Sequence, residues 1–227
     1  MTIGDGNGAI ASQGGGMRLF QSAVCRGCMF TNCTAVRGGA IAIKGGTAEN
    51  CTFVGNKASS EYGGGVYQDA GTLRGALIVG NTAKVSGGGL AQDGGTAVNV
   101  TIADNVSPAS AGAKVAGTLV NSIVVGKGEY DPANPPLVVN GKGSVRKCCS
   151  PSLTAEDCLS CDPLFVRREA GDYAIRGSSK CVGFGDNSAW PNLKTAVDLN
   201  GNRRLKGQRI DLGGYESDGR GMLLLVK

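Results

Sequence analysis

Two Gln-Asp pairs, Gln68-Asp69 and Gln92-Asp93, recur along the chain at an interval of 24 residues. If repeats of this length stack on one another, the two carboxylates come within about 5 Å, the spacing of adjacent parallel strands. Such a pair can hold Ca²⁺ or act as the two carboxyl groups of a retaining glycosidase. Both Asp residues also enter glycine turns, which Asp favours, and Lys44 stands at the equivalent place one repeat earlier. We therefore expect turn residues first, a ligand-binding strip second and catalysis last.

Histidine is absent from the sequence. This excludes Ser-His and Cys-His nucleophilic machinery and the usual zinc-histidine sites. Any enzymatic mechanism would rest on carboxylates, Lys, Arg, Tyr or a hard cation. Because no catalytic motif is recognisable either, we predict no catalytic residues and favour a protein that is not an enzyme.

A second polar motif, DLNGN, places Asp198, Asn200 and Asn202 at alternating positions, like the first half of a calcium loop. Arg203 occupies the sixth place, where an EF-hand needs glycine. A structural turn is the favoured interpretation. No cofactor is predicted, and Ca²⁺ is the alternative.

The nine cysteines fall into two groups. Cys28 and Cys51 hold equivalent positions in adjacent repeats, which suits a ladder of buried thiols or a disulfide. The second group is Cys148, Cys149, Cys158, Cys161 and Cys181. Its CC and CLSC motifs suggest a four-thiolate zinc site, although eight residues between the pairs is tight for a zinc ribbon. Disulfides, zinc and free thiols are all compatible with the spacing.

A repeat of 24 or 25 residues organises the first half of the chain. Clusters of glycine are followed by an apolar residue at Met17, Ile41, Val66, Leu90 and Val115. An asparagine recurs in phase at Asn32, Asn56, Asn81 and Asn105. Side-chain amides stacked at this interval would form a ladder of hydrogen bonds from one repeat to the next.

Between these markers lie short segments with alternating apolar residues: CMFTN, CTFVGN, ALIVGN and VTIADN. Their period is that of strands, and the turns leave no room for a helix. A unit of this size cannot bury its own apolar face and must stack on its neighbours. The sequence therefore predicts an all-β fold, a right-handed parallel β-helix of about 24–25 residues per coil with an irregular C-terminal cap.

We expect one continuous domain. Residues 1–126 form the regular coils and residues 127–161 an irregular insertion or loop with Pro and Cys. Residues 162–216 form terminal coils and the cap, and residues 217–227 a tail.

The chain has 227 residues and a net charge of +5, with Lys and Arg scattered and no aromatic residues interleaved among them. This disfavours nucleic acid as a partner. No apolar stretch is long enough to span a membrane, and no signal peptide is visible. Because the chain begins inside a repeat, we expect it to be an excerpt of a longer protein.

Two groups of motifs carry a family resemblance. GGAI at 38–41, followed by FVGN at 53–56, resembles the paired repeats of bacterial polymorphic outer-membrane proteins, which are pectin-lyase-like β-helix proteins that act mainly as surface adhesins. Further on, DPLF, GDYAI, SSKCVGFG, DLNGNRR and IDLGGYE resemble the C-terminal region of secreted bacterial choice-of-anchor β-helix proteins. Lys180, Gly183 and Gly214 depart from that pattern.

The second resemblance implies that these motifs build the last coils and a cap that closes an open end of the β-helix. It also implies an extracellular or cell-surface location. In such proteins disulfides are common, and we expect one between Cys158 and Cys161 and another from Cys148 or Cys149 to Cys181.

Taken together, we expect a non-enzymatic extracellular domain of a bacterial surface or secreted protein. It would be adhesin-like or structural and would bind glycans or surface proteins on its side wall. A fragment of a polysaccharide-acting enzyme, similar to pectate lyases or polygalacturonases, is the alternative. A self-associating filament subunit is a weaker one.

Overall fold

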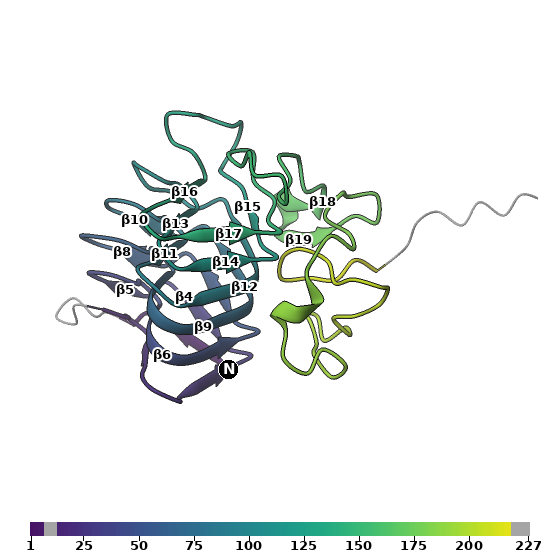
Figure 1. The fold of residues 1–227 in the computed structure, drawn as a ribbon. Coiled ribbons are helices and arrows are strands. Elements are labelled where there is room, and N and C mark those ends of the chain that lie inside the picture. Colours follow the sequence, from purple (N-terminus) through teal and green to yellow (C-terminus); the bar gives the residue numbers. More distant parts are fainter. Residues whose placement is uncertain (7–12, 219–227) are drawn as a thin grey trace, which may run out of the picture.

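The computed structural model describes residues 1–6 and 13–218. The chain forms a parallel β-solenoid of about six turns, which confirms the predicted fold class (Figure 1). Residues 219–227, the larger part of the expected tail, lie outside the described residues. Among the residues described, no helix is long and apolar enough to cross a membrane.

Three walls of parallel strands enclose the core. The first wall holds β1 (Thr2–Gly4), β4 (Met29–Thr31), β7 (Thr52–Val54), the last residues of β9 (Val66–Val79) and of β12 (Thr96–Ala103), and β15 (Ile123–Val124). The second wall holds β2 (Met17–Leu19), the first residues of β6 (Ile41–Glu49) and of β9, β11 (Leu90–Gln92), β13 (Ala113–Val115) and β16 (Leu137–Val139). The third wall holds β3 (Val24–Arg26), the last residues of β6, the middle of β9, the first residues of β12, β14 (Thr118–Val120) and β17 (Ser144–Arg146). A short ladder of β5 (Thr34–Ala35), β8 (Lys57–Ala58) and β10 (Thr82–Ala83) lines one corner.

Alternation along each strand decides what enters the core. In the first wall Phe30, Phe53, Ile78 and Ile102 point inward and are fully buried. The rings of Phe30 and Phe53 stack with centroids 5.2 Å apart. Because equivalent residues repeat at the spacing of neighbouring strands, each coil buries its apolar side chains on those of the next.

An asparagine ladder follows the first wall. Asn81 Oδ1 accepts hydrogen bonds from the backbone N–H and the side-chain amide of Asn56, both at 2.9 Å. Asn105 Oδ1 accepts the same two bonds from Asn81. In the preceding coil the position belongs to Cys33, whose N–H donates to Asn56.

Asn32 is therefore not part of the ladder, contrary to the prediction. It lies one residue earlier, exposed, with φ of 54°. The equivalent residues of later coils, Gly55, Gly80 and Asp104, share this left-handed conformation. Asn tolerates that conformation, so Asn32 meets the requirement of a turn, whereas Asn56, Asn81 and Asn105 form the ladder.

Residues 127–161 are more regular than expected. After an excursion over 127–136, β16 pairs in parallel with β13 and β17 pairs with β14. Cys149 then bridges to Ile123 on one side and to Leu159 on the other. The segment thus adds a further coil to the solenoid, with a loop inserted before it.

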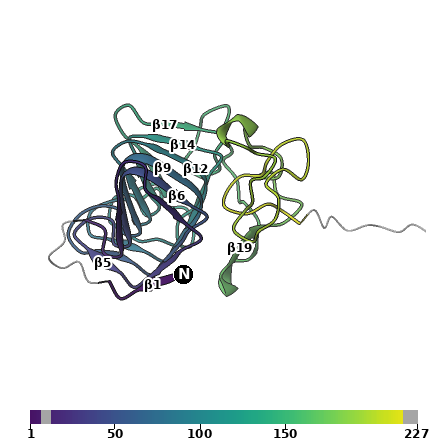
Figure 2. The same cartoon turned by 90° about the horizontal axis from the view of Figure 1, so that it is seen from below.

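The C-terminal segment, residues 162–218, does not continue the coils. It contains an antiparallel pair, β18 (Phe165–Arg167) and β19 (Asp172–Ile175), and two short 3₁₀ turns, η1 (Arg168–Ala170) and η2 (Asn187–Ala189). Both views show it beside the solenoid rather than over an end (Figures 1 and 2). The expected end cap is therefore a lateral cover.

The cover explains why the first wall is apolar on its outer side too. Leu77, Val79 and Ile123 point outward there, and the cluster that buries them includes Phe165 and Leu212 of the C-terminal segment. A continuous apolar run such as ALIV in β9 is what a strand buried on both faces requires.

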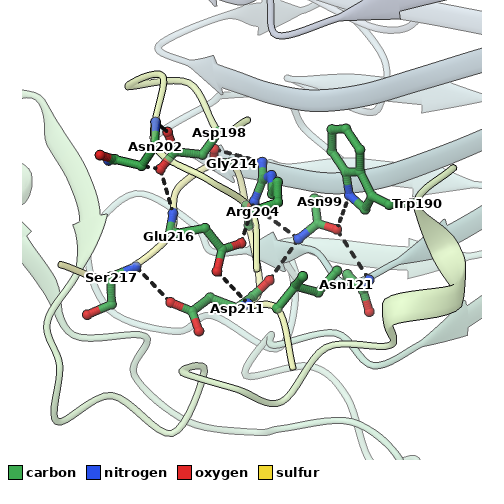
Figure 3. A network of polar contacts seen from close by, with 12 residues as sticks. Asn99, Asn121, Trp190, Asp198, Asn202, Arg204, Asp211, Gly214, Glu216 and Ser217 are labelled. Atoms are coloured by element: carbon green, nitrogen blue, oxygen red, sulfur yellow. Dashed lines mark hydrogen bonds and ion pairs between the residues drawn. The ribbon is translucent and has the colours of Figure 1, made fainter. Parts of the chain in front are cut away.

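A buried polar network fastens the cover to the solenoid (Figure 3). The indole N–H of Trp190 donates a hydrogen bond to Asn99 Oδ1 at 2.7 Å, and the side-chain amide of Asn99 donates to the carbonyl oxygen of Asp211 at 2.8 Å. Within the cover itself, Arg204 is fully buried; it pairs with Glu216 at 3.1 Å and donates to the carbonyls of Gly213 and Gly214. These bonds give the buried guanidinium charge the partners that burial requires.

Candidate functional site

The predicted Gln-Asp strip divides between the inside and the outside of the second wall. Gln68 and Gln92 point inward and are fully buried, with the Gln92 amide donating to Gln68 Oε1 at 2.9 Å. They cannot contact a ligand on the wall, so their assignment as ligand-binding residues is wrong. Asp69 and Asp93 come directly after them and lie on the outer face, with 35% and 42% of their side chains exposed.

Tyr67 joins the two carboxylates. It also lies on the outer face, between Ala42 and Ala91 of the neighbouring coils. Its hydroxyl is 2.6 Å from Asp93 Oδ2 and 3.1 Å from Asp69 Oδ1, so its single proton can serve only one of them at a time. Burial and the neighbouring Asp93 raise the pKa of Tyr67. The phenol therefore stays protonated and acts as a donor.

Two lysines complete the strip. Lys44 pairs with Asp69, and Lys114 lies 3.7 Å from Asp93. Lys44, which the sequence places one repeat earlier, thus neutralises Asp69, and Lys114 provides a second cation that the sequence did not single out. With two carboxylates and two ammonium groups the strip has no net charge, which disfavours a divalent cation there.

Aromatic rings near the strip already have partners. Lys114 Nζ lies 4.4 Å from the centre of the Tyr62 ring, and Arg37 lies 5.5 Å from that of Tyr67. Tyr67 is only 2% exposed. The strip therefore offers hydrogen-bonding groups rather than a flat apolar platform.

The candidate calcium ligands have no arrangement for a cation. Both oxygens of Asp198 accept from N–H groups: Oδ1 from the backbone of Asn200 and Asn202, and Oδ2 from the backbone of Glu216 at 2.8 Å. The side chain of Asn202 also donates to Asp198. A carboxylate surrounded by donors stabilises a turn, and the motif links that turn to the network around Glu216.

A cavity of about 470 Å³ lies under the 127–136 excursion. Tyr130, Pro136 and Pro163 contribute apolar surface, while Asn134 and Arg168 bring polar groups. Asn134 Oδ1 is buried without a hydrogen-bond partner. Sequence reasoning missed this site; the prolines of the excursion marked a loop but not a hollow beneath it.

The cysteines separate into an inner and an outer set. None of the nine, all of which lie in described parts of the chain, forms a disulfide. Cys148 points into the core, and Cys158 packs against the same cluster. Cys149, Cys161 and Cys181 gather outside the first wall, under the C-terminal segment.

This separation has two consequences for the predictions. Cys158 and Cys161 lie in different clusters, so the expected local bridge between them is not supported. A site using all four thiols of CC and CLSC is excluded for the same reason. Cys181 is near Cys149 rather than Cys148, as one of the two expected pairings requires.

In the first coils, the strand register places Cys28 beside Cys51. The close thiol contact, however, is between Cys25 and Cys51, whose sulfur atoms are 3.8 Å apart. Burial raises the pKa of Cys51. Cys25 and Cys51 are thus buried thiols that form part of the apolar core.

Comparisons with protein-family models, with curated proteins and with solved structures found no match to this chain.

Proposed function

We propose that this chain is a non-enzymatic binding module of a secreted or cell-surface bacterial protein, and that it binds glycans along the outer face of its second wall. The observation that carries the proposal is the strip, in which Lys44, Asp69, Asp93 and Lys114 surround the Tyr67 hydroxyl. The extracellular location rests on the motif resemblance alone.

The chemistry of the strip suits a polyhydroxylated ligand. Carboxylates accept hydrogen bonds from sugar hydroxyls, and ammonium groups donate to ring and hydroxyl oxygens. Because the groups belong to successive coils, they repeat at about 4.8 Å along the solenoid axis. A ligand made of repeated hydroxyl-bearing units can therefore contact several coils at once, which adds binding energy without requiring a deep pocket.

The side chains are also held in place before binding. Each Asp is fixed by an ion pair to Lys and a contact with the Tyr67 hydroxyl, and Tyr67 itself is buried by its neighbours. The side chains of the strip therefore lose little conformational entropy when a ligand binds.

The test is a glycan array probed with the full chain, uronate-rich glycans included, with each hit quantified by calorimetry. We expect the double variant D69N/D93N to weaken binding about tenfold or more, since charge-assisted hydrogen bonds contribute about 1.5–3 kcal/mol each. The control E156Q removes an exposed carboxylate that is not part of the strip and should bind like the parent. Binding that D69N/D93N leaves unchanged, or no binding to any glycan, would overturn the proposal.

A second candidate function has one specific observation in its favour. Two partly exposed carboxylates on either side of a protonated phenol have the composition of an acid-base site for glycoside cleavage. It predicts that the chain releases reducing or unsaturated ends from a polysaccharide on the array, and that D69N/D93N abolishes the release. Binding without any release favours the non-enzymatic function.

A further inference from the structure

Three thiols meet where the solenoid, the excursion and the lateral cover come together. The sulfur atoms of Cys149, Cys161 and Cys181 all lie within 4.8 Å of one another. Cys149 follows β17 in the last coil, Cys161 lies in the link to the C-terminal segment, and Cys181 belongs to that segment. Cys149 and Cys181 are fully buried and Cys161 is partly buried.

The spacing of these sulfur atoms matches that of ligands on one metal ion. A zinc–sulfur bond is about 2.3 Å long, so two thiolates on the same ion are about 3.8 Å apart in tetrahedral geometry and about 4.0 Å apart in trigonal geometry. The sulfur atoms of Cys149 and Cys161 are 3.8 Å apart. Small side-chain rotations would bring Cys181 to the same distance.

Three thiols also fit one ion better than they fit a covalent bridge. A disulfide would join two of them and leave the third buried beside it, whereas one ion uses all three. The sequence contains no histidine, so a soft ion held by thiolates alone is the chemistry that this cluster favours. Zn²⁺ and Cu⁺ are the ions that such ligands select.

We propose that Cys149, Cys161 and Cys181 bind one thiophilic d¹⁰ metal ion, Zn²⁺ or Cu⁺, which ties the C-terminal segment to the last coil of the solenoid. On binding, each thiol loses its proton and three sulfur–metal bonds form, so three protons are released per ion. With Zn²⁺ the complex has one net negative charge and a fourth position for water. The partly buried side of Cys161 leaves room for that water.

The surroundings by themselves oppose this loss of protons. Burial raises the pKa of the Cys161 thiol, although the nearby charge of Lys180 acts against the rise. A hydrogen bond with Cys181, together with burial, holds the pKa of Cys149 well above its usual range. A metal ion supplies the positive charge that these buried thiolates lack.

The cavity provides the access route. Cys161 lines it together with Asp162 and Pro163, so an ion that enters under the excursion reaches this residue before Cys149 and Cys181. Cys149 and Cys181 lie behind it. The excursion, which forms no wall of the solenoid, thus becomes the entrance to the site.

The test uses the full chain, reduced, freed of metal and kept without oxygen. Cd²⁺ serves as the probe because thiolate-to-Cd²⁺ charge transfer gives an ultraviolet absorption that Zn²⁺ lacks. We expect the absorption to saturate at one ion per chain, with three thiols becoming unreactive toward a thiol reagent. Direct Zn²⁺ competition should remove the signal.

Matched variants separate this site from the other cysteines. C161S, which changes a partly buried thiol, and C181A should abolish stoichiometric Cd²⁺ binding. C148S and C158S come from the same CC and CLSC motifs but belong to the inner cluster, and they should retain it. Circular dichroism establishes that each variant is folded.

A second measurement follows docking rather than absorption. Cd²⁺ at one hundred times its dissociation constant should lower the undocked population about a hundredfold, and limited proteolysis of the C-terminal segment, residues 162–218, should slow accordingly. Binding that persists in folded C161S, a parent chain that binds no Cd²⁺, or a disulfide between any two of these cysteines in the protein as isolated from its native source would overturn the proposal.

Discussion

Asn56 and Asn81 stand one coil apart, and the side-chain oxygen of Asn81 accepts both the backbone N–H and the side-chain amide of Asn56 at 2.9 Å. The same side chain of Asn81 donates to the carbonyls of Phe53 and Val79. One buried amide therefore satisfies polar groups of its own coil and of the coil before it. This makes the ladder a means of fixing the register of the solenoid.

The ladder predicts a strong contrast between two asparagines. N81A removes these bonds and leaves buried N–H and carbonyl groups without partners, which should lower the free energy of unfolding by about 2–5 kcal/mol. N32G, at the exposed left-handed position that later coils give to glycine, should change it by less than about 1 kcal/mol. Denaturant unfolding of both variants measures the difference. Equal effects would show that the ladder has no special role.

The glycine clusters predict a second contrast. A Cβ at Gly64 would lie 2.1 Å from the carbonyl oxygen of Gly88 in the next coil, whereas Gly207 has open space around it. G64A must push two coils apart and should prevent folding or cost several kcal/mol. G207A should fold like the parent. Circular dichroism and thermal unfolding compare the two, and a stable G64A would contradict the close approach of the coils.

The buried pair of Arg204 and Glu216 predicts a dependence of stability on pH. Burial raises the pKa of Glu216 from 4.5 to about 7, against the opposing effect of Arg204. The folded state therefore holds this proton more tightly than the unfolded state. Its contribution to stability is full below pH 4.5 and is lost as the pH rises to about 7, with a slope of at most about 1.4 kcal/mol per pH unit.

The variant E216Q tests this dependence. It should be less stable than the parent at low pH, because Gln presents an N–H group to Arg204 or to the Asp211 N–H. Its stability should nevertheless lack the decline between pH 4.5 and 7. Unfolding free energies of both proteins are measured across that pH range. If E216Q loses stability with the same slope as the parent, the pH dependence belongs to other groups.

Asp186 predicts the opposite dependence in acid. Hydrogen bonds from Ser188 and the charge of Arg146 lower its pKa from 3.8 to about 2. Because the folded pKa is depressed, this contribution is present above pH 3.8 and is lost as the pH falls to about 2. D186N should lower the free energy of unfolding by up to about 2 kcal/mol at neutral pH. It should also reduce the loss of stability between pH 3.8 and about 2. Urea unfolding of D186N and of the parent at pH 2–5 measures this pH dependence, with E156Q as the control.

Much of the solenoid can be read from the sequence because its determinants are local. Alternating apolar residues define which side of a strand faces inward, and the 24- or 25-residue interval sets the stacking of Ile41, Val66 and Leu90. Glycine and asparagine turns mark the corners. Each of these signals involves neighbours in sequence or in the next coil, so a single chain is enough to find them.

The candidate site could be predicted from the sequence only in part. The phase that aligns Asp69 with Asp93 was visible, but a shift of one residue turns a side chain from the outer face to the core. Gln68 and Gln92, one position earlier, therefore face inward. The same shift separates Asn32 from the ladder and Cys148 from Cys149.

Residue spacing alone predicts the repeat, the fold class and one strand segment in each coil. The position of the C-terminal segment and the meeting of the three thiols depend instead on contacts between residues that are distant in sequence. The amide of Asn99 binds the carbonyl of Asp211, 112 residues away. No local period encodes such a contact; it forms because the apolar outer side of the first wall and the apolar residues of the C-terminal segment bury one another.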